Sequence, residues 1–147
     1  MGDFIRDITK PDGTIVQFGD NDSGRFLKIF PDLDERNHQY LIRSIRNCHG
    51  LNSVIRAQLE RHTETSVPFA HYTDFGLSIH RRGPWYLAMR CGSIGQKGNG
   101  GHAHHDQLSF ELAVRGVSMI IDPGTYVYTP WPEERRRFRS TSMHNTL

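Results

Sequence analysis

The chain has 147 residues, of which 36% are hydrophobic and 23% are charged. This composition excludes an intrinsically disordered chain and is sufficient for the core of one domain. The net charge of +2 is too small to argue for a nucleic-acid partner, and no stretch approaches the apolar length of a transmembrane helix.

The first thirty residues are predicted to be irregular or extended. The N-terminal stretch MGDFIRDITK lacks the apolar run of a signal peptide. Farther on, GDNDSGR at 19–25 predicts a loop of turn-forming residues. Residues 20–22 of that loop could hold calcium, but the spacing and closing glutamate of an EF-hand are missing, which favours a turn that organises a domain junction.

A helical pattern runs from Asp32 to about His62, with two apolar faces that are separated near Gly50. We therefore interpret residues 1–66 as a connecting segment with one or two helices. The two cysteines, Cys48 and Cys91, are compatible with reduced thiols, one disulfide or two buried thiols, and they do not identify the compartment.

The pattern changes after residue 67, where short strand-like runs replace the helical periodicity. These runs are GLSIH (76–80), WYLAMRC (85–91), QLSFELAV (107–114) and SMIID (118–122), and two of the links between them, RRGP and VRGV, predict hairpin turns. Residues 67–147 are therefore predicted to form an antiparallel, partial β-sandwich. Because so few strands would leave apolar edges unpaired, we expect the chain to be a piece of a larger protein.

Three histidines and an aspartate stand together before the third of these strands, in GGHAHHD. In an extended segment His102, His104 and Asp106 share one face, and His105 takes the other. Two imidazoles two residues apart can converge on one metal or one substrate. The hairpin pairing would bring Asp122 near His104, and His144 is a further candidate ligand. Two histidines and a carboxylate are typical of zinc.

Two other interpretations of these histidines stay open at this point. In one, they form an exposed polar loop or a hydrogen-bonded network without metal. In the other, the chain is a cupin-like metalloenzyme with Glu111 as the later glutamate and His144 as the distal histidine. The interval from His104 to Glu111 fits a cupin poorly.

Several blocks in fixed order resemble the heparinase II/III family of polysaccharide lyases. They are FGDNDSGRFLKI, GQKGNGGHAHHDQLSFELAVRG, IIDPGTYVYT and RRRFRSTSMHNT. The resemblance implies a helical toroid followed by an antiparallel β-sandwich, with the active site between them. This chain would span the end of the toroid side and the first part of the sandwich.

The resemblance also implies roles for single residues. His102 matches the family's active-site histidine, and His104, Asp122 and His144 match the ligands of one structural zinc. Asp106 is expected to orient an imidazole and not to bind the metal itself, and no role is assigned to His105.

The implied chemistry is β-elimination at a uronic acid, with His102 in a proton-transfer or neutralising role. Tyr126, Arg135 and Arg139 are candidate contacts of the substrate, and the whole basic cluster at 134–139 would suit carboxylates or sulfates, although exposed arginines are often plain surface. Tyr128 could line the same cleft as Tyr126, or its ring could be buried.

The chain is predicted to have little activity alone, because the family's toroid supplies a tyrosine and an asparagine or histidine that have no match in it. The alternative is a noncatalytic, metal-pinned sandwich that binds anionic glycans. Expected partners are an acidic polysaccharide, the missing toroid and, as an open option, a second copy of the chain, with neither nucleic acid nor membrane insertion. The resemblance implies a periplasmic or secreted bacterial protein and does not separate heparan-type, alginate and exopolysaccharide substrates.

Overall fold

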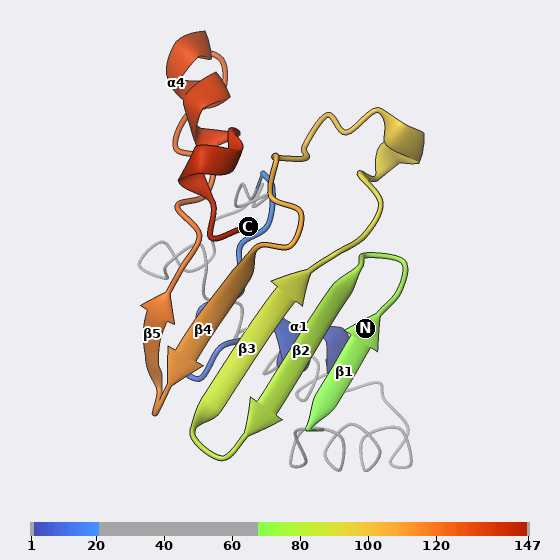
Figure 1. The fold of residues 1–147 in the computed structure, drawn as a ribbon, viewed down its shortest axis with the longest axis vertical. Helices are drawn as coiled ribbons and strands as arrows, with labels where there is room; N and C mark the ends of the chain where they lie inside the picture. The colour runs from blue at the N-terminus through green and yellow to red at the C-terminus, as the bar shows by residue number, and fades with distance from the viewer. Residues whose placement is uncertain (1, 21–67, 147) are drawn as a thin grey trace, which may run out of the picture.

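The computed structural model describes residues 2–20 and 68–146, and these form one antiparallel sheet with one short helix behind one face and another beyond one end (Figure 1). The elements are α1 (Gly2–Ile8), β1 (Phe69–Tyr72), β2 (Leu77–Arg82), β3 (Trp85–Arg90), β4 (Phe110–Val114), β5 (Val117–Ile120) and α4 (Pro132–Phe138), with 3₁₀ turns at Gln96–Gly98 and Thr141–Met143. The predicted fold class is confirmed: the described part is mainly β with a short helical part.

The five strands follow one another in the sheet in the order β1-β2-β3-β4-β5, and every neighbouring pair is antiparallel. All four predicted strands are present, and the two predicted hairpin turns join β2 to β3 and β4 to β5. In the second turn Arg115 and Gly116 have φ values of 53° and 81°. Two consecutive positive values match the twist of the flanking strands, which is why a glycine suits this hairpin.

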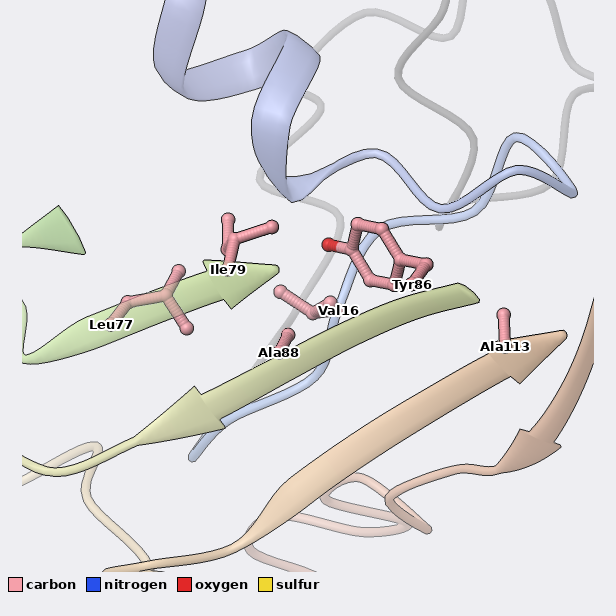
Figure 2. Close-up of a cluster of buried hydrophobic side chains, with 6 residues drawn as sticks. All are labelled: Val16, Leu77, Ile79, Tyr86, Ala88 and Ala113. Carbon is pink, nitrogen blue, oxygen red and sulfur yellow. The ribbon is translucent and has the colours of Figure 1, made fainter. Parts of the chain in front are cut away.

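One face of the sheet carries the hydrophobic core (Figure 2). Side chains alternate between the two faces of a strand, so β2 buries Leu77 and Ile79 while β3 buries Tyr86 and Ala88. Residues 2–20 cover this face, and Val16 belongs to the same buried cluster. The N-terminal segment is therefore part of the packing of the sheet.

Helix α1 corrects the prediction that the first residues are irregular or extended. A helix of seven residues is not stable alone, and this one depends on contacts with the sheet. Phe4 and Ile8, one turn apart, pack against the core cluster. The Arg81 guanidinium from β2 donates hydrogen bonds to the carbonyl oxygens of Arg6, Asp7 and Thr9, at 3.1, 2.9 and 2.8 Å. It thereby satisfies carbonyl groups at the end of the helix.

A buried ion pair fastens the same N-terminal segment to β4. Lys10 Nζ lies 2.7 Å from Glu111 Oε2, and the two side chains are 5% and 0% exposed. The other carboxylate oxygen, Oε1, accepts hydrogen bonds from the backbone N–H of Gln17 at 2.9 Å and of Asp122 at 3.3 Å. Glu111 thus links Lys10, Gln17 and Asp122 to strand β4.

Several predictions fall on residues that the structure does not describe. The helices expected between 32 and 62, Cys48 and two of the three proposed calcium ligands lie outside 2–20 and 68–146. Cys91, which is described, is exposed and carries a free thiol. The predicted boundary between residues 66 and 67 stays a prediction. No helix in the described ranges is both long and apolar enough to cross a membrane.

Candidate functional site

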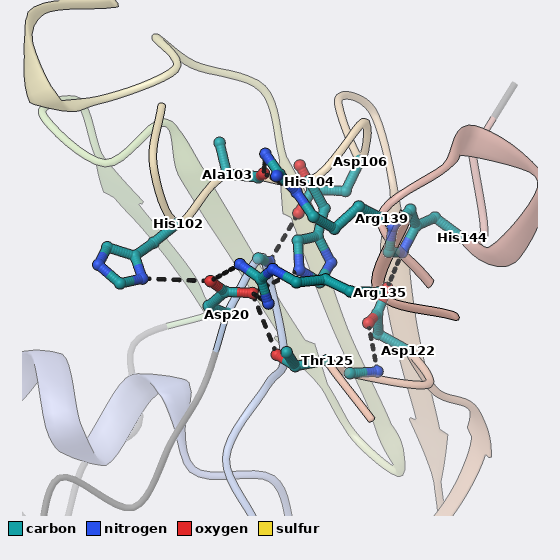
Figure 3. A network of polar contacts seen from close by, with 12 residues as sticks. Asp20, His102, Ala103, His104, Asp106, Asp122, Thr125, Arg135, Arg139 and His144 are labelled. Carbon is teal, nitrogen blue, oxygen red and sulfur yellow. Dashed lines mark hydrogen bonds and ion pairs between the residues drawn. The ribbon is translucent and has the colours of Figure 1, made fainter. Parts of the chain in front are cut away.

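The predicted site residues meet at one end of the sheet, beyond the end of β3 and the start of β4 (Figures 1 and 3). They come from stretches that are far apart in the sequence: the end of the N-terminal segment at 19–20, the link between β3 and β4 at 102–106, the stretch after β5 at 122–125, helix α4, and the turn before His144. Residues 102–106, which we call the histidine loop, lie outside the strands, since β4 begins only at Phe110.

Gly19 and Asp20 lie against the backbone of the histidine loop. The Asp20 N–H donates to the His102 carbonyl oxygen at 2.9 Å. Gly19 has a φ of +66°, and a Cβ at this position would stand 2.6 Å from that same carbonyl oxygen. Only a glycine allows so close an approach without strain. This contact brings the Asp20 side chain among the histidines.

The Asp20 carboxylate is the centre of the network in Figure 3. Its Oδ2 lies 3.1 Å from His102 Nδ1 and its Oδ1 lies 2.8 Å from His104 Nε2. Arg135 donates to both oxygens, at 2.7 and 3.3 Å, and the Thr125 hydroxyl donates to Oδ1 at 3.3 Å. Burial works to raise the pKa of Asp20, but hydrogen bonds from Arg135, His104 and His102 lower it to about 2.

The predicted alternation of the histidine loop is present in these contacts. His102 and His104 both reach Asp20, and Asp106 Oδ2 accepts a hydrogen bond from the neighbouring Gly19 N–H at 2.8 Å. His105 is exposed and its backbone N–H donates to the Arg139 carbonyl oxygen at 2.9 Å. Asp106 accepts this hydrogen bond through one of its two carboxylate oxygens, and its expected role in orienting an imidazole stays a prediction.

His104, Asp122 and His144 form a second group, whose members are all buried. Asp122 Oδ2 lies 2.6 Å from His144 Nδ1, and the rings of His104 and His144 have centroids 5.2 Å apart. Both imidazole side chains are 0% exposed. Burial lowers the pKa of His104. Burial also opposes the charged form of His144, but its hydrogen bond with Asp122 raises the pKa of that residue.

Two nitrogens of this group, His104 Nδ1 and His144 Nε2, have no hydrogen-bond partner among the described residues. A buried imidazole nitrogen without a partner is costly unless something binds it, and zinc takes such nitrogens as ligands. The two imidazoles therefore fit zinc, whereas Asp122 contacts Nδ1 of His144, the ring nitrogen opposite the one that lacks a partner. Within 2–20 and 68–146, no three His, Cys, Asp or Glu side chains are already gathered at metal-binding distances.

The three predicted substrate contacts are placed differently from one another. Tyr126 is 61% exposed and its ring stacks on Phe138 at 4.8 Å. Arg135 is held by Asp20 and lies over the Tyr128 ring at 4.5 Å. Arg139 donates two hydrogen bonds to the Ala103 carbonyl oxygen, at 3.1 and 2.8 Å. Arg139 thus holds the histidine loop and Arg135 holds Asp20, and contact with substrate stays a prediction for all three residues.

His102 is the histidine of this network that solvent reaches, since its side chain is 66% exposed. It borders a cavity of about 280 Å³ that is also lined by Phe75, Arg90 and Asp106. His104, His105 and Arg139 line a second cavity, of about 490 Å³. The histidine loop therefore borders open space on two sides, one next to His102 and the other next to His104 and His105.

Two functional assignments need correction or addition. The cupin-like interpretation is wrong, because Glu111 is engaged by Lys10 and two backbone amides beneath the sheet. The sequence predicts only a loop-organising role for Asp20, yet this residue contacts both histidines. Its place in the block FGDNDSGRFLKI was the available signal, but nothing in the sequence pairs it with residues more than eighty positions away.

Comparisons with known proteins point to one family. The family described as "Heparinase II/III-like, C-terminal" matches residues 64–147. Among solved structures, a heparinase III gene product has 22% identity, a TM-score of 0.67, and an alignment that covers 97% of this chain and 22% of that one. The heparan sulfate lyase HepC from Pedobacter heparinus has 18% identity and a TM-score of 0.63, with 94% of this chain and 21% of that one covered.

A further structure, named heparinase III, has 16% identity and a TM-score of 0.66, with 99% of this chain and 25% of that one covered. A search of curated proteins gives no match. These likenesses establish a heparinase-like fold, and the chain spans about a fifth to a quarter of the length of the structures it matches. Since the family match covers more than half of the sequence, the chain belongs to the heparinase II/III-like family.

Proposed function

We propose that this chain is part of a polysaccharide lyase that cleaves uronate-containing polysaccharides by β-elimination, with His102 facing the substrate. The observation that carries the proposal is the placement of His102 in a chain of this family. Its imidazole is exposed at the border of a cavity and is held at Nδ1 by a buried carboxylate. An imidazole fixed at one nitrogen and open at the other is suited to a proton-transfer step.

In this reaction a base removes the C5 proton of the uronic acid, and the electron pair forms the C4–C5 double bond. The bond from C4 to the glycosidic oxygen breaks, and an acid protonates the leaving oxygen. Negative charge grows on the uronate carboxylate and needs a neutralising donor. His102 can take one of these proton-transfer or neutralising roles, and the rest would come from groups outside this chain.

We also propose that His104, Asp122 and His144 hold one zinc ion. The proposal is supported by the two buried nitrogens that lack partners within the described ranges. Bound zinc would supply stability by joining the histidine loop to the stretch that follows β5 and to the turn before His144. The noncatalytic alternative is a glycan-binding sandwich stabilised by the same zinc site. In that alternative His102 has no catalytic role.

The lyase proposal is tested with the protein encoded by the complete open reading frame that contains these residues. We expect ultraviolet absorbance from unsaturated uronate to rise when it meets a heparan-type or other uronate-containing polysaccharide. His102→Ala should slow that rise by about 100-fold or more, the usual loss when a proton-transfer group is removed.

His105→Ala is the matched control, because His105 lies on the same loop, is exposed, and contacts Arg139 through its backbone. It should leave the rate nearly unchanged. Absence of product with every uronate-containing polysaccharide, together with retained glycan binding, would instead support the noncatalytic alternative. The 147-residue chain alone is expected to give little or no product.

The zinc proposal predicts about one zinc per chain after purification without chelators. Elemental analysis should find that ion lost in His104→Ala and kept in His105→Ala. Removing zinc from the unsubstituted chain should lower its melting temperature, since a ligand at 100 times its Kd stabilises by about 2.7 kcal/mol. A folded chain that contains no zinc and is not stabilised by it would refute the site.

A further inference from the structure

Asp20 contacts the two functional histidines through opposite ring nitrogens. Its Oδ2 faces Nδ1 of His102 at 3.1 Å, whereas its Oδ1 faces Nε2 of His104 at 2.8 Å. The Asp20 side chain is 1% exposed, so water does not compete for these positions. One buried carboxylate is thus shared by two imidazoles of different surroundings (Figure 3).

The contacts to Arg135 determine which partner donates in these hydrogen bonds. The guanidinium donates to Oδ2 at 2.7 Å and to Oδ1 at 3.3 Å, a two-pronged contact that holds Asp20 as a carboxylate. An ionised carboxylate only accepts hydrogen bonds, so each imidazole nitrogen that faces it must carry a hydrogen. A neutral imidazole has only one N–H, and its other nitrogen therefore carries the lone pair.

We propose that Asp20 is a positioning residue that fixes the two histidines in opposite tautomers. His102 is held with its hydrogen on Nδ1 and its lone pair on Nε2. His104 is held with its hydrogen on Nε2 and its lone pair on Nδ1. The two rings, two residues apart on one loop, are thereby prepared for different tasks by the same side chain.

An independent observation agrees with this assignment for His104. Its Nδ1 is buried and has no hydrogen-bond partner in the part of the chain that the structure describes, so a hydrogen there would be a donor with nothing to bind. A lone pair at the same atom is what a metal requires. The lone pair of His102, by contrast, lies on a ring that is mostly open to solvent, where a proton of the substrate could be taken.

The backbone keeps this arrangement in place. The Asp20 N–H donates to the His102 carbonyl oxygen, and Gly19 N–H donates to the buried Asp106 carboxylate. These contacts fix the distance between Asp20 and the loop without involving either ring. The tasks given to the two rings rest on the proposed function, but the tautomers themselves do not depend on it.

The test is long-range ¹H–¹⁵N NMR of the chain labelled at histidine, freed of metal by a chelator, at about pH 8, where an ordinary imidazole is neutral. His102→Ala and His104→Ala identify the two sets of signals. We expect His102 to show the pattern of an Nδ1–H ring and His104 that of an Nε2–H ring. An Nε2–H pattern for His102, or an Nδ1–H pattern for His104, would overturn the proposal even before any variant of Asp20 is made.

Asp20→Asn tests whether Asp20 is what fixes the two tautomers. An amide offers one accepting oxygen in place of two, so at least one of the rings should lose its assigned tautomer. Asp12→Asn is the control, because Asp12 is a carboxylate of the same N-terminal segment whose hydrogen-bond partners among the described residues are Thr14 and Ser118 and not a histidine, and it should leave both patterns unchanged. If both tautomers persist in folded Asp20→Asn, Asp20 is not their cause and the proposal fails.

The outcome is separable from that of the proposed function. The opposite tautomers in a protein with no lyase activity and no zinc would uphold the positioning role and refute the proposed function. Lyase activity and zinc in a protein whose rings share one tautomer would do the reverse.

Discussion

Glu111→Ala is expected to lower the free energy of unfolding by about 3–5 kcal/mol, the usual cost of removing one partner from a buried ion pair. The carboxylate is 0% exposed and lies 2.7 Å from the ammonium group of Lys10, which is itself 5% exposed. Without Glu111 this ammonium group would remain buried without the carboxylate that balances its charge. The N–H groups of Gln17 and Asp122 would also lose their acceptor.

Urea denaturation provides the measurement, and the chain offers two controls. Glu134→Ala breaks an exposed pair with Arg137 on α4 and should cost less than about 1 kcal/mol. The double change Lys10→Met with Glu111→Leu removes both charges together and should recover much of the loss. A Glu111→Ala protein no less stable than Glu134→Ala would show that the pair does not hold the N-terminal segment to β4.

Four of the five strands, β2 to β5, could be predicted from the sequence because their determinants are local, whereas β1 was not predicted. Alternation in β2 and β3 places Leu77, Ile79, Tyr86 and Ala88 on one face, and a glycine marks each short turn. Helix α1 could not be predicted in this way. Its last carbonyl groups are satisfied by Arg81, more than seventy residues away, so no pattern within its own seven residues reveals it.

The site shows the same division between local and distant determinants. The motifs pointed to His102, His104, Asp122 and His144, and the alternation along the histidine loop anticipated that two of these rings face the same way. Which group they face is decided by a long-range contact with Asp20, which no spacing encodes.

Arginines and acids near the site were harder to interpret from sequence for a related reason. Charge alone indicates an anionic ligand, but a guanidinium is equally satisfied by a carbonyl oxygen of its own chain. Arg139 donates to the Ala103 carbonyl oxygen, and Asp106 accepts a hydrogen bond from the backbone N–H of Gly19. The partner of a polar side chain depends on the packing around it, and packing is known only when the fold is known.

Gly76→Ala is expected to cost at least about 3 kcal/mol, which combines left-handed backbone strain with a collision that no side-chain rotation relieves. Gly76 has a φ of +67°, and a Cβ there would lie 2.5 Å from the Cys91 carbonyl oxygen and 2.6 Å from the Gly92 nitrogen. It would also overlap the Gly92 Cα. These are backbone atoms at the end of β3, which leads directly into the link that carries His102.

Gly83→Ala separates the two contributions, because Gly83 has a comparable φ of +55° but a Cβ added there would meet no atom of the described residues within 4 Å. Only the strain of about 1 kcal/mol should remain at this position. Thermal or urea unfolding of the two variants measures the difference, which should be about 2 kcal/mol or more in favour of Gly83→Ala.

The same pair of variants tests whether the close approach of Gly76 to Gly92 positions the site. Because the collision is at the start of the link between β3 and β4, which carries the histidine loop, Gly76→Ala should also weaken the proposed zinc binding. Gly83→Ala, at the opposite end of β2 and β3, should leave zinc binding unchanged. Equal stability and equal zinc content in the two variants would mean that this contact between Gly76 and Gly92 has no part in holding the histidine loop.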